Sequence, residues 1–150
     1  MNPLHIALRY LERRARTEKE LRQKLADRYV VPQEVEAVLG KLKDLGYIND
    51  QKFALDFQRS HDDYKPVGKQ RLKMDLTMKG VPKEIIATIT TDKEKEYTLA
   101  LRAAQTRLRQ YANLDSQIFY RRMSGFLARR GFDYGTIKRV IEDVRTKPQP

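Results

Sequence analysis

The chain has 150 residues, of which 40% are hydrophobic and 34% are charged, and its formal net charge is +11. Because it contains no cysteine, a disulfide framework and a thiolate metal site are excluded. The charge predicts a polyanionic partner, either nucleic acid or an acidic protein surface, since a positive field raises the local concentration of polyanions.

The N-terminal segment MNPLHIALRYLERR does not resemble a targeting signal. It carries Arg9, Arg13 and Arg14 and lacks the apolar run and cleavage site of a signal peptide. No stretch of the chain approaches the roughly 20 apolar residues of a membrane span. We therefore expect a cytoplasmic protein without a membrane partner.

Apolar residues recur with a helical period along almost the whole chain, and no strand pattern interrupts them. The first helices are expected to begin at Asn2-Pro3, at the capping box Thr17-x-x-Glu20 and at Val31-Pro32. The remaining helices are expected over 50–62, around Leu72 and Leu76 up to Lys79-Gly80, from Val81-Pro82, over 93–112, from Asp115 or Ser116 to Gly131, and from Asp133, with a frayed tail at 147–150.

The turn GYIND between the third and fourth helices is unusually apolar for a surface linker. Gly46 suits the left-handed position after a helix, and Tyr47 is expected to fold back onto the last helical turn. Ile48 precedes the next helix start, near Asp50, and is expected to pack on Phe53. We interpret Gly46, Tyr47, Ile48, Asp50 and Phe53 as a structural joint with a core on each side, not as a flexible linker.

Three stretches of the chain follow one pattern, LRQKLADRYVVPQEVEAVL, LKMDLTMKGVPKEIIATI and MSGFLARRGFDYGTIKRVI. Each has two apolar residues four apart, then an apolar residue that begins a short helix, at Val31, Val81 and Phe132, with spacings of 50 and 51. The prediction is an all-α fold of three tandem three-helix repeats over 1–48, 49–91 and 92–146, with helix-turn-helix-like units stacked into an elongated, curved body.

Three blocks resemble the signatures of RecX-type regulatory proteins: RTEKELRQKL (16–25), LGYINDQKFALDF (45–57) and QRLKMDLTMKGVPKEII (70–86). Asp75 stands where the third block usually has Glu, and the third repeat's FLARRGF fits the family's C-terminal pattern. The resemblance implies three tandem three-helix repeats in a bacterial cytoplasmic protein. It also implies a regulator that binds the RecA recombinase filament on single-stranded DNA and restrains its ATPase, strand exchange and coprotease activity.

An enzyme is a competing class, but the sequence offers little chemistry for one. We interpret His5 as an ordinary helix residue. A Mg²⁺ cluster could be imagined from His61-Asp62-Asp63 with Asp56, but the polar end of a helix explains these residues more simply. P-loop, nucleophile-elbow and H-E-x-x-H motifs are absent from the sequence. We therefore expect a protein that acts by binding, without catalytic residues, metal or cofactor.

The basic side chains are the candidate binding residues. Residues 92–150 carry 13 basic and 7 acidic side chains, so the excess charge is largest in the third repeat. For any single Lys or Arg, a solvated helix face is the alternative, while Tyr64 and Tyr120 are candidates for stacking on bases. The predicted partner or nucleic-acid contacts are Lys69, Arg71, Lys73 and Lys79 on the fifth helix, and Arg121, Arg122, Arg129 and Arg130 on the eighth.

A second functional hypothesis is a sequence-specific DNA-binding repressor that uses its helix-turn-helix-like units. A repressor of this kind is usually a two-fold dimer that reads paired half-sites. The sequence has no leucine-rich dimer seam, so we expect a monomer and favour the filament regulator.

Overall fold

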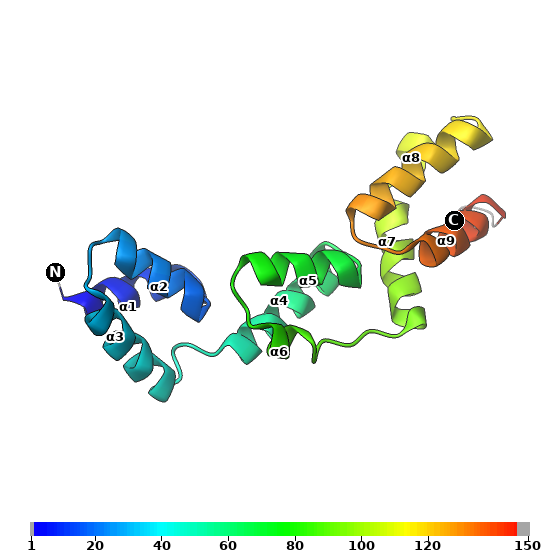
Figure 1. Cartoon of the computed structure of the whole chain (residues 1–150). Coiled ribbons are helices and arrows are strands. Elements are labelled where there is room, and N and C mark those ends of the chain that lie inside the picture. The colour runs from blue at the N-terminus through cyan, green and yellow to red at the C-terminus, as the bar shows by residue number, and fades with distance from the viewer. Residues whose placement is uncertain (1, 147–150) are drawn as a thin grey trace. The chain divides into compact units, whose positions relative to one another are not determined.

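The computed structural model describes residues 2–146, and all regular secondary structure in that range is helical (Figure 1). The prediction of an all-α fold is therefore confirmed, while the frayed tail predicted at 147–150 lies outside the described residues. In chain order the helices are α1 (Pro3–Arg13), α2 (Glu18–Asp27), α3 (Pro32–Asp44), α4 (Asp50–Tyr64), α5 (Lys69–Met78), α6 (Lys83–Ile86), α7 (Lys93–Tyr111), α8 (Ser116–Arg129) and α9 (Tyr134–Thr146).

The helices begin where short polar residues and prolines predicted them. The side chains of Asn2, Asp92 and Asp115 each accept a hydrogen bond from a backbone N–H two or three residues later, at 2.8, 2.7 and 3.0 Å. Each bond satisfies an amide that has no partner inside its helix. Pro3 and Pro32 occupy first helical positions, where the missing N–H removes no helical bond.

The chain divides into two compact units. The first comprises the residues up to Phe57 together with Asp75–Ile89, and the second comprises Gln58–Met74 together with the residues from Thr90 onward. Helices α4 and α5 therefore each contribute residues to both units. The repeat boundaries at 48/49 and 91/92 stay a prediction.

The core of the first unit lies among α1, α2 and α3, which group at the N-terminal end of the chain (Figure 1). Leu21, Leu25 and Leu42 are fully buried there, and Ile48 joins them from the turn after α3. Burying a leucine side chain stabilises the fold by about 2 kcal/mol, so these few residues account for much of the unit's stability.

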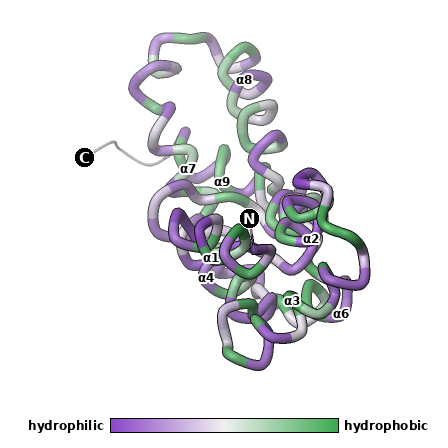
Figure 2. Tube along the Cα trace, turned by 90° about the vertical axis from the view of Figure 1, so that its left-hand side faces the viewer, coloured by the Kyte–Doolittle hydropathy of each residue, from purple (hydrophilic) through white to green (hydrophobic). Residues whose placement is uncertain are grey.

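In the second unit, α7 packs against both α8 and α9, and α8 packs against α9. α7 presents Ala100, Ala103 and Ala104, which are fully buried and lie on one face because they are three and four residues apart. Their small side chains let Met123 of α8 and Val140 of α9 approach closely. Figure 2 shows hydrophobic and hydrophilic residues alternating along α8, as an amphipathic helix requires.

The turn after the second helix is built in the same way in all three repeats. The backbone N–H groups of the residues that follow it donate to a leucine carbonyl five positions earlier, which is the Schellman pattern. These bonds run from Val30 to Leu25, from Val81 to Leu76 and from Phe132 to Leu127, at 3.1, 3.0 and 3.2 Å, so equivalent residues lie 51 positions apart.

The alignment of Val31 with Val81 and Phe132 was therefore wrong by one residue. Val30 is the equivalent position and packs partly buried against the first core, whereas Val31 is 55% exposed. The matching Val-Pro pairs misled the alignment, because the first repeat has one extra residue between its turn and Pro32.

The structure gives the local conformation at Gly46, Tyr47, Ile48, Asp50 and Phe53, whose role as a joint between repeats stays a prediction. Gly46 has φ 82°, and the Tyr47 N–H donates to the Leu42 carbonyl at 2.9 Å, as a helix ended by glycine requires. Ile48 and Phe53 are buried. The prediction that Tyr47 packs back onto the helix was wrong, since its side chain is 57% exposed. Only Ile48 of the two apolar linker residues anchors the turn.

Candidate nucleic-acid interface

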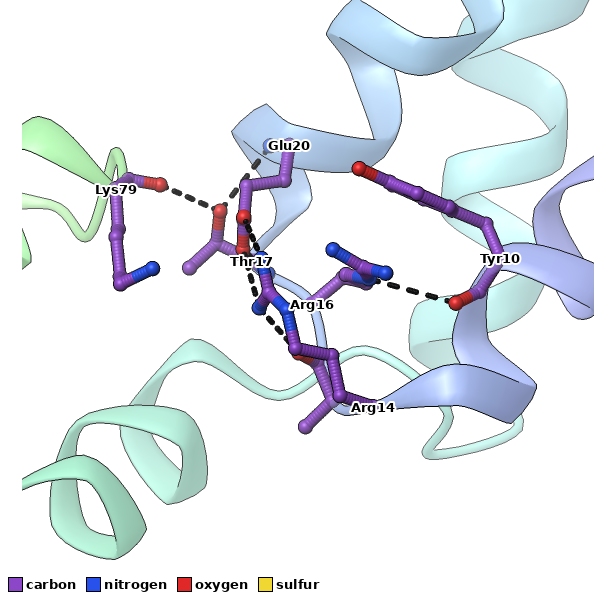
Figure 3. Close-up of polar contacts among 7 residues, drawn as sticks. Tyr10, Arg14, Arg16, Thr17, Glu20 and Lys79 are labelled. Atoms are coloured by element: carbon purple, nitrogen blue, oxygen red, sulfur yellow. Dashed lines mark hydrogen bonds and ion pairs between the residues drawn. The ribbon is translucent and has the colours of Figure 1, made fainter. Parts of the chain in front are cut away.

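Thr17 connects the first repeat to the turn after α5 within the first unit (Figure 3). Its hydroxyl accepts the Glu20 N–H at 3.1 Å, which completes the predicted capping box of α2. The same hydroxyl donates to the Lys79 carbonyl at 2.6 Å. A single hydroxyl oxygen thus caps α2 and joins two repeats, and Thr17 is fully buried.

We expect Thr17→Val to lower the free energy of unfolding by about 2 kcal/mol. Valine keeps the shape but removes the cap and leaves the Lys79 carbonyl without this donor. Urea unfolding followed by circular dichroism measures the change. Thr17→Ser, which keeps the hydroxyl, is the control and should lose less than about 1 kcal/mol. A valine variant as stable as the serine variant would contradict the role of the hydroxyl.

Two arginines beside Thr17 are held in place by local contacts (Figure 3). The Arg16 guanidinium lies 3.6 Å from the centre of the Tyr10 ring, and Arg14 forms an ion pair with Glu20 at 2.6 Å. Burial raises the pKa of Glu20, but the hydrogen bonds from Arg14 and from the Thr17 N–H together bring this pKa below its ordinary value. These two cations therefore support the fold around α2.

Asp50 joins α2 to the start of α4 in the first unit. Its carboxylate accepts the Glu18 N–H at 3.0 Å. Burial raises the pKa of Asp50, and this effect exceeds the lowering by the bond from Glu18. The sequence identified Asp50 as part of the joint but gave no sign that its partner lies on α2.

We expect the stability contributed by Asp50 to decline as the pH rises. The folded state holds the Asp50 proton to a higher pH than the unfolded state does, so the stability present at low pH is lost as the pH passes from the ordinary to the raised pKa. Asp50→Asn keeps an acceptor for Glu18 and should remove this decline, as measured by urea unfolding at several pH values. Asp44→Asn, at an exposed aspartate, is the matched control for the loss of one carboxylate.

The basic residues predicted on the fifth helix are half-buried, and two of them are held by contacts with other residues. The Arg71 guanidinium donates to the Arg129 carbonyl at 2.8 Å, and the Lys79 ammonium lies 5.7 Å from the centre of the Phe57 ring. The structure thus brings Arg71 to the end of α8 in the second unit, while Lys79 belongs to the first unit. The four half-buried residues of this set are Lys69, Arg71, Lys73 and Lys79.

The predicted arginines of α8 divide into two kinds. Arg121, Arg122 and Arg129 are exposed, and Arg122 and Arg129 lie on the same helix face because they are seven residues apart. Arg130 is half-buried, and its guanidinium donates to the Pro66 carbonyl at 3.0 Å. The first three remain candidates for a polyanion, whereas Arg130 holds the α4–α5 turn.

The structure adds Arg107 of α7, which the sequence analysis did not single out. The guanidiniums of Arg107 and Arg130 lie 4.6 and 4.8 Å from the centre of the Phe126 ring. Burial lowers the pKa of Arg130, and the positive charges of Arg107 and Arg71 lower it further. The packing of α7 on α8 brings Arg107 to Arg130, and the contact of α5 with the end of α8 adds Arg71, so no sequence spacing could have revealed Arg107.

A second basic surface, also missed from the sequence, lies between α1 and α2 in the first unit. We call it the α1–α2 groove; its volume is about 220 Å³. A signal was present in the sequence, because its cations occur as two pairs spaced four apart, which places each pair on one helix face. The charged side chains that line it are Arg9, Arg13, Lys24, Arg28 and Glu12.

The imagined metal cluster at the end of α4 is engaged in other contacts. Asp62 pairs with Lys95 at 2.9 Å, and the Lys65 carbonyl lies 3.3 Å from the His61 Nδ1. Within residues 2–146, no three His, Cys, Asp or Glu side chains gather as a metal site would need. In the same part of the chain, none of the helices combines the length and the apolarity needed to cross a bilayer.

Comparison with known proteins finds similarity to a single family along most of the chain. Three family models match in tandem: the RecX first three-helix domain over residues 4–42, the second over 49–88 and the third over 94–141. The regulatory protein RecX of Amycolatopsis mediterranei (strain U-32) is 36% identical over 132 residues, which cover 87% of this chain and 75% of that protein. The regulatory protein RecX of Chlorobium phaeobacteroides (strain BS1) is 30% identical over 141 residues, covering 93% and 91%.

A solved structure has the same fold. The crystal structure of RecX from Lactobacillus salivarius matches with a TM-score of 0.83 and 24% identity, over 97% of this chain and 96% of that one. At this identity the match establishes the fold alone, and it agrees with three three-helix domains.

Proposed function

From the premise that this chain belongs to the RecX family, we propose that it is a regulatory protein that binds the RecA recombinase filament on single-stranded DNA. In this proposal it restrains the recombinase, ATPase and coprotease activities of the filament, and so modulates DNA repair, recombination and the SOS response. It acts in the cytoplasm as a monomer, without cofactor or catalysis.

The observation that carries the proposal is the tandem match of all three RecX domains in a chain with a net charge of +11. A recombinase filament on DNA combines a repeating protein surface with a polyanion. Exposed cations on separate repeats, such as Arg9, Arg13 and Arg28 of the α1–α2 groove and the exposed arginines of α8, suit such a partner. Several weak contacts on one chain raise the overall affinity, because after the first contact the others are made at a high effective concentration.

Inhibition by binding alone is physically sufficient. A protein that binds one state of the filament more tightly than another shifts the equilibrium toward the tighter state. No nucleophile, general base or metal is needed for that shift. The exposed arginines Arg121, Arg122 and Arg129 are the proposed phosphate contacts of the third repeat.

One structural feature disfavours the alternative of a sequence-specific repressor. A recognition helix has to lie along the major groove with several side chains on base edges. In the second repeat the third helix, α6, has only four residues and is about 6 Å long. That repeat is therefore a poor reader of base sequence.

The test is RecA-dependent ATP hydrolysis on single-stranded DNA during titration with this protein. We expect hydrolysis to fall to a low plateau. A parallel titration onto random-sequence duplex DNA without recombinase measures direct binding. Unchanged hydrolysis at saturation would remove the filament-regulator proposal, and tight preference for particular duplex sequences would favour the repressor instead.

A further inference from the structure

Tyr29, in the turn after α2, has a backbone conformation that its side chain does not explain. Among residues 2–146 it is the single non-glycine residue with positive φ, at 62°. This conformation is unfavourable for a residue with a Cβ atom. The ring is 93% exposed, so packing does not compensate for the strain.

Glycine occupies the equivalent positions of the other two repeats, and there a side chain would clash. A Cβ at Gly80 would lie 2.4 Å from the Cβ of Lys19, and a Cβ at Gly131 would lie 2.3 Å from the Cβ of Arg71. In each case the start of an earlier helix covers the turn. Glycine is therefore required wherever the turn is covered.

The covering segments also bind the carbonyl that precedes each glycine. The Lys79 carbonyl accepts the Thr17 hydroxyl at 2.6 Å, and the Arg130 carbonyl accepts the Gly68 N–H at 2.7 Å. The equivalent residue of the first repeat is Arg28, which is exposed. Arg28 and Tyr29, which we call the first turn, are thus the open counterpart of a surface that the later repeats cover.

The first turn adjoins the α1–α2 groove, because Arg28 belongs to both. Four cations and one carboxylate line this groove, so it favours an anion. An exposed aromatic ring therefore stands beside a basic groove.

We propose that the first turn and the α1–α2 groove form a binding site for single-stranded DNA, with a base stacked on the Tyr29 ring and neighbouring phosphodiesters in the groove. The inference rests on the proposed binding of single-stranded DNA and assigns part of it to the first repeat. Stacking of bases on an aromatic side chain beside a basic groove is the usual way to hold single strands without reading their sequence. A duplex does not offer its base faces, and an acidic peptide would use the groove but not the ring.

The chain contains no tryptophan, so a Tyr29→Trp variant carries a single tryptophan emitter at the first turn. We expect oligothymidylate to quench its fluorescence in a saturable titration. The matched control is Tyr47→Trp, at a tyrosine of the first unit that is 57% exposed and does not line the groove, and it should quench far less. Absent quenching at position 29, or equal quenching in both variants, would overturn the assignment.

A second variant separates binding from folding. Tyr29→Gly relieves the backbone strain and should raise the stability of the protein, while affinity for the oligonucleotide should fall by about tenfold. Tyr29→Phe should bind as the wild type does, because the ring is kept. A Tyr29→Gly variant with wild-type affinity would overturn the proposal, and its added stability would exclude unfolding as the cause of any loss.

The outcomes also separate this site from the proposed function. If wild-type protein restrains ATP hydrolysis while the Tyr29→Trp fluorescence ignores DNA, the site is wrong and the regulator proposal stands. If hydrolysis is unaffected while DNA quenches only the Tyr29→Trp variant, the binding site stands and the regulator proposal is wrong. Quenching by the recombinase without DNA, and not by DNA alone, would assign the first turn to a protein surface and overturn the assignment to nucleic acid.

Discussion

Gly131→Ala should lower the free energy of unfolding of the second unit by about 3 kcal/mol. A Cβ there would stand 2.3 Å from the Arg71 Cβ and 2.5 Å from the Arg71 backbone nitrogen. The backbone of α5 cannot yield as a flexible side chain does, so overpacking adds about 1–3 kcal/mol to the roughly 1 kcal/mol that a left-handed alanine costs. Urea unfolding followed by circular dichroism measures the sum.

Gly46→Ala is the matched control for this prediction. Gly46 has a similar φ, 82° against 93°, but its Cβ would meet nothing within 4 Å. We expect it to lose only the conformational part, about 1 kcal/mol. Equal losses at the two glycines would show that the contact with Arg71 carries no energy and that backbone conformation alone requires glycine.

Replacing the three exposed arginines of α8, Arg121, Arg122 and Arg129, by glutamine should flatten the salt dependence of binding to single-stranded DNA. Each lost phosphate contact reduces the slope of log K against log salt by about 0.7, so the triple variant should lose about 2. The physical reason is that fewer counterions are released from the strand on binding. Affinities measured between low and moderate salt give the slope.

A charge-matched variant separates contacts from the general field. Glutamine at Lys41, Lys83 and Lys93, which are exposed on α3, α6 and α7, removes the same net charge. Its slope should stay close to that of the wild type. If both triple variants lose the same slope, the α8 arginines act only through the net charge and are not phosphate contacts.

The local elements followed from the sequence because their causes are local. The capping aspartates, the prolines at helix starts and Gly46 act on residues within one or two turns of themselves. Tyr47 shows the limit of such reasoning. The residue after a glycine that ends a helix is expected to have a buried apolar side chain, yet Tyr47 is exposed. The local sequence does not indicate whether a neighbouring helix covers that side chain.

Repeat detection was limited in a similar way. The period was visible in the sequence, but the shared Val-Pro pairs shifted the first repeat by one residue relative to the others. The shift was resolved by the backbone bond from Val30 to Leu25, which matches those at Val81 and Phe132. The matching Val-Pro pairs gave the wrong alignment because such a pair can start a helix at any distance from the preceding turn.

The sequence predicted that the candidate site consists of basic residues, but it did not predict which of them are exposed. Charge and helical period marked the third repeat as basic, and Arg121, Arg122 and Arg129 are indeed exposed. Arg71 and Arg130 were not distinguishable from them in the sequence but donate to backbone carbonyls, and Arg107 of α7 shares the Phe126 ring with Arg130. Whether an arginine faces solvent or a carbonyl depends on which helix packs beside it.

The sequence by itself determined the helical class, the helix ends, the threefold repeat and the family, because these depend on short-range spacing and on motifs within single segments. Only the tertiary structure decided which glycines are indispensable, which cations are exposed to a polyanion and which of the three equivalent turns is left uncovered. Those properties depend on contacts between residues 50 or more positions apart, such as Thr17 with Lys79 and Gly68 with Arg130, and chain spacing carries no information about them.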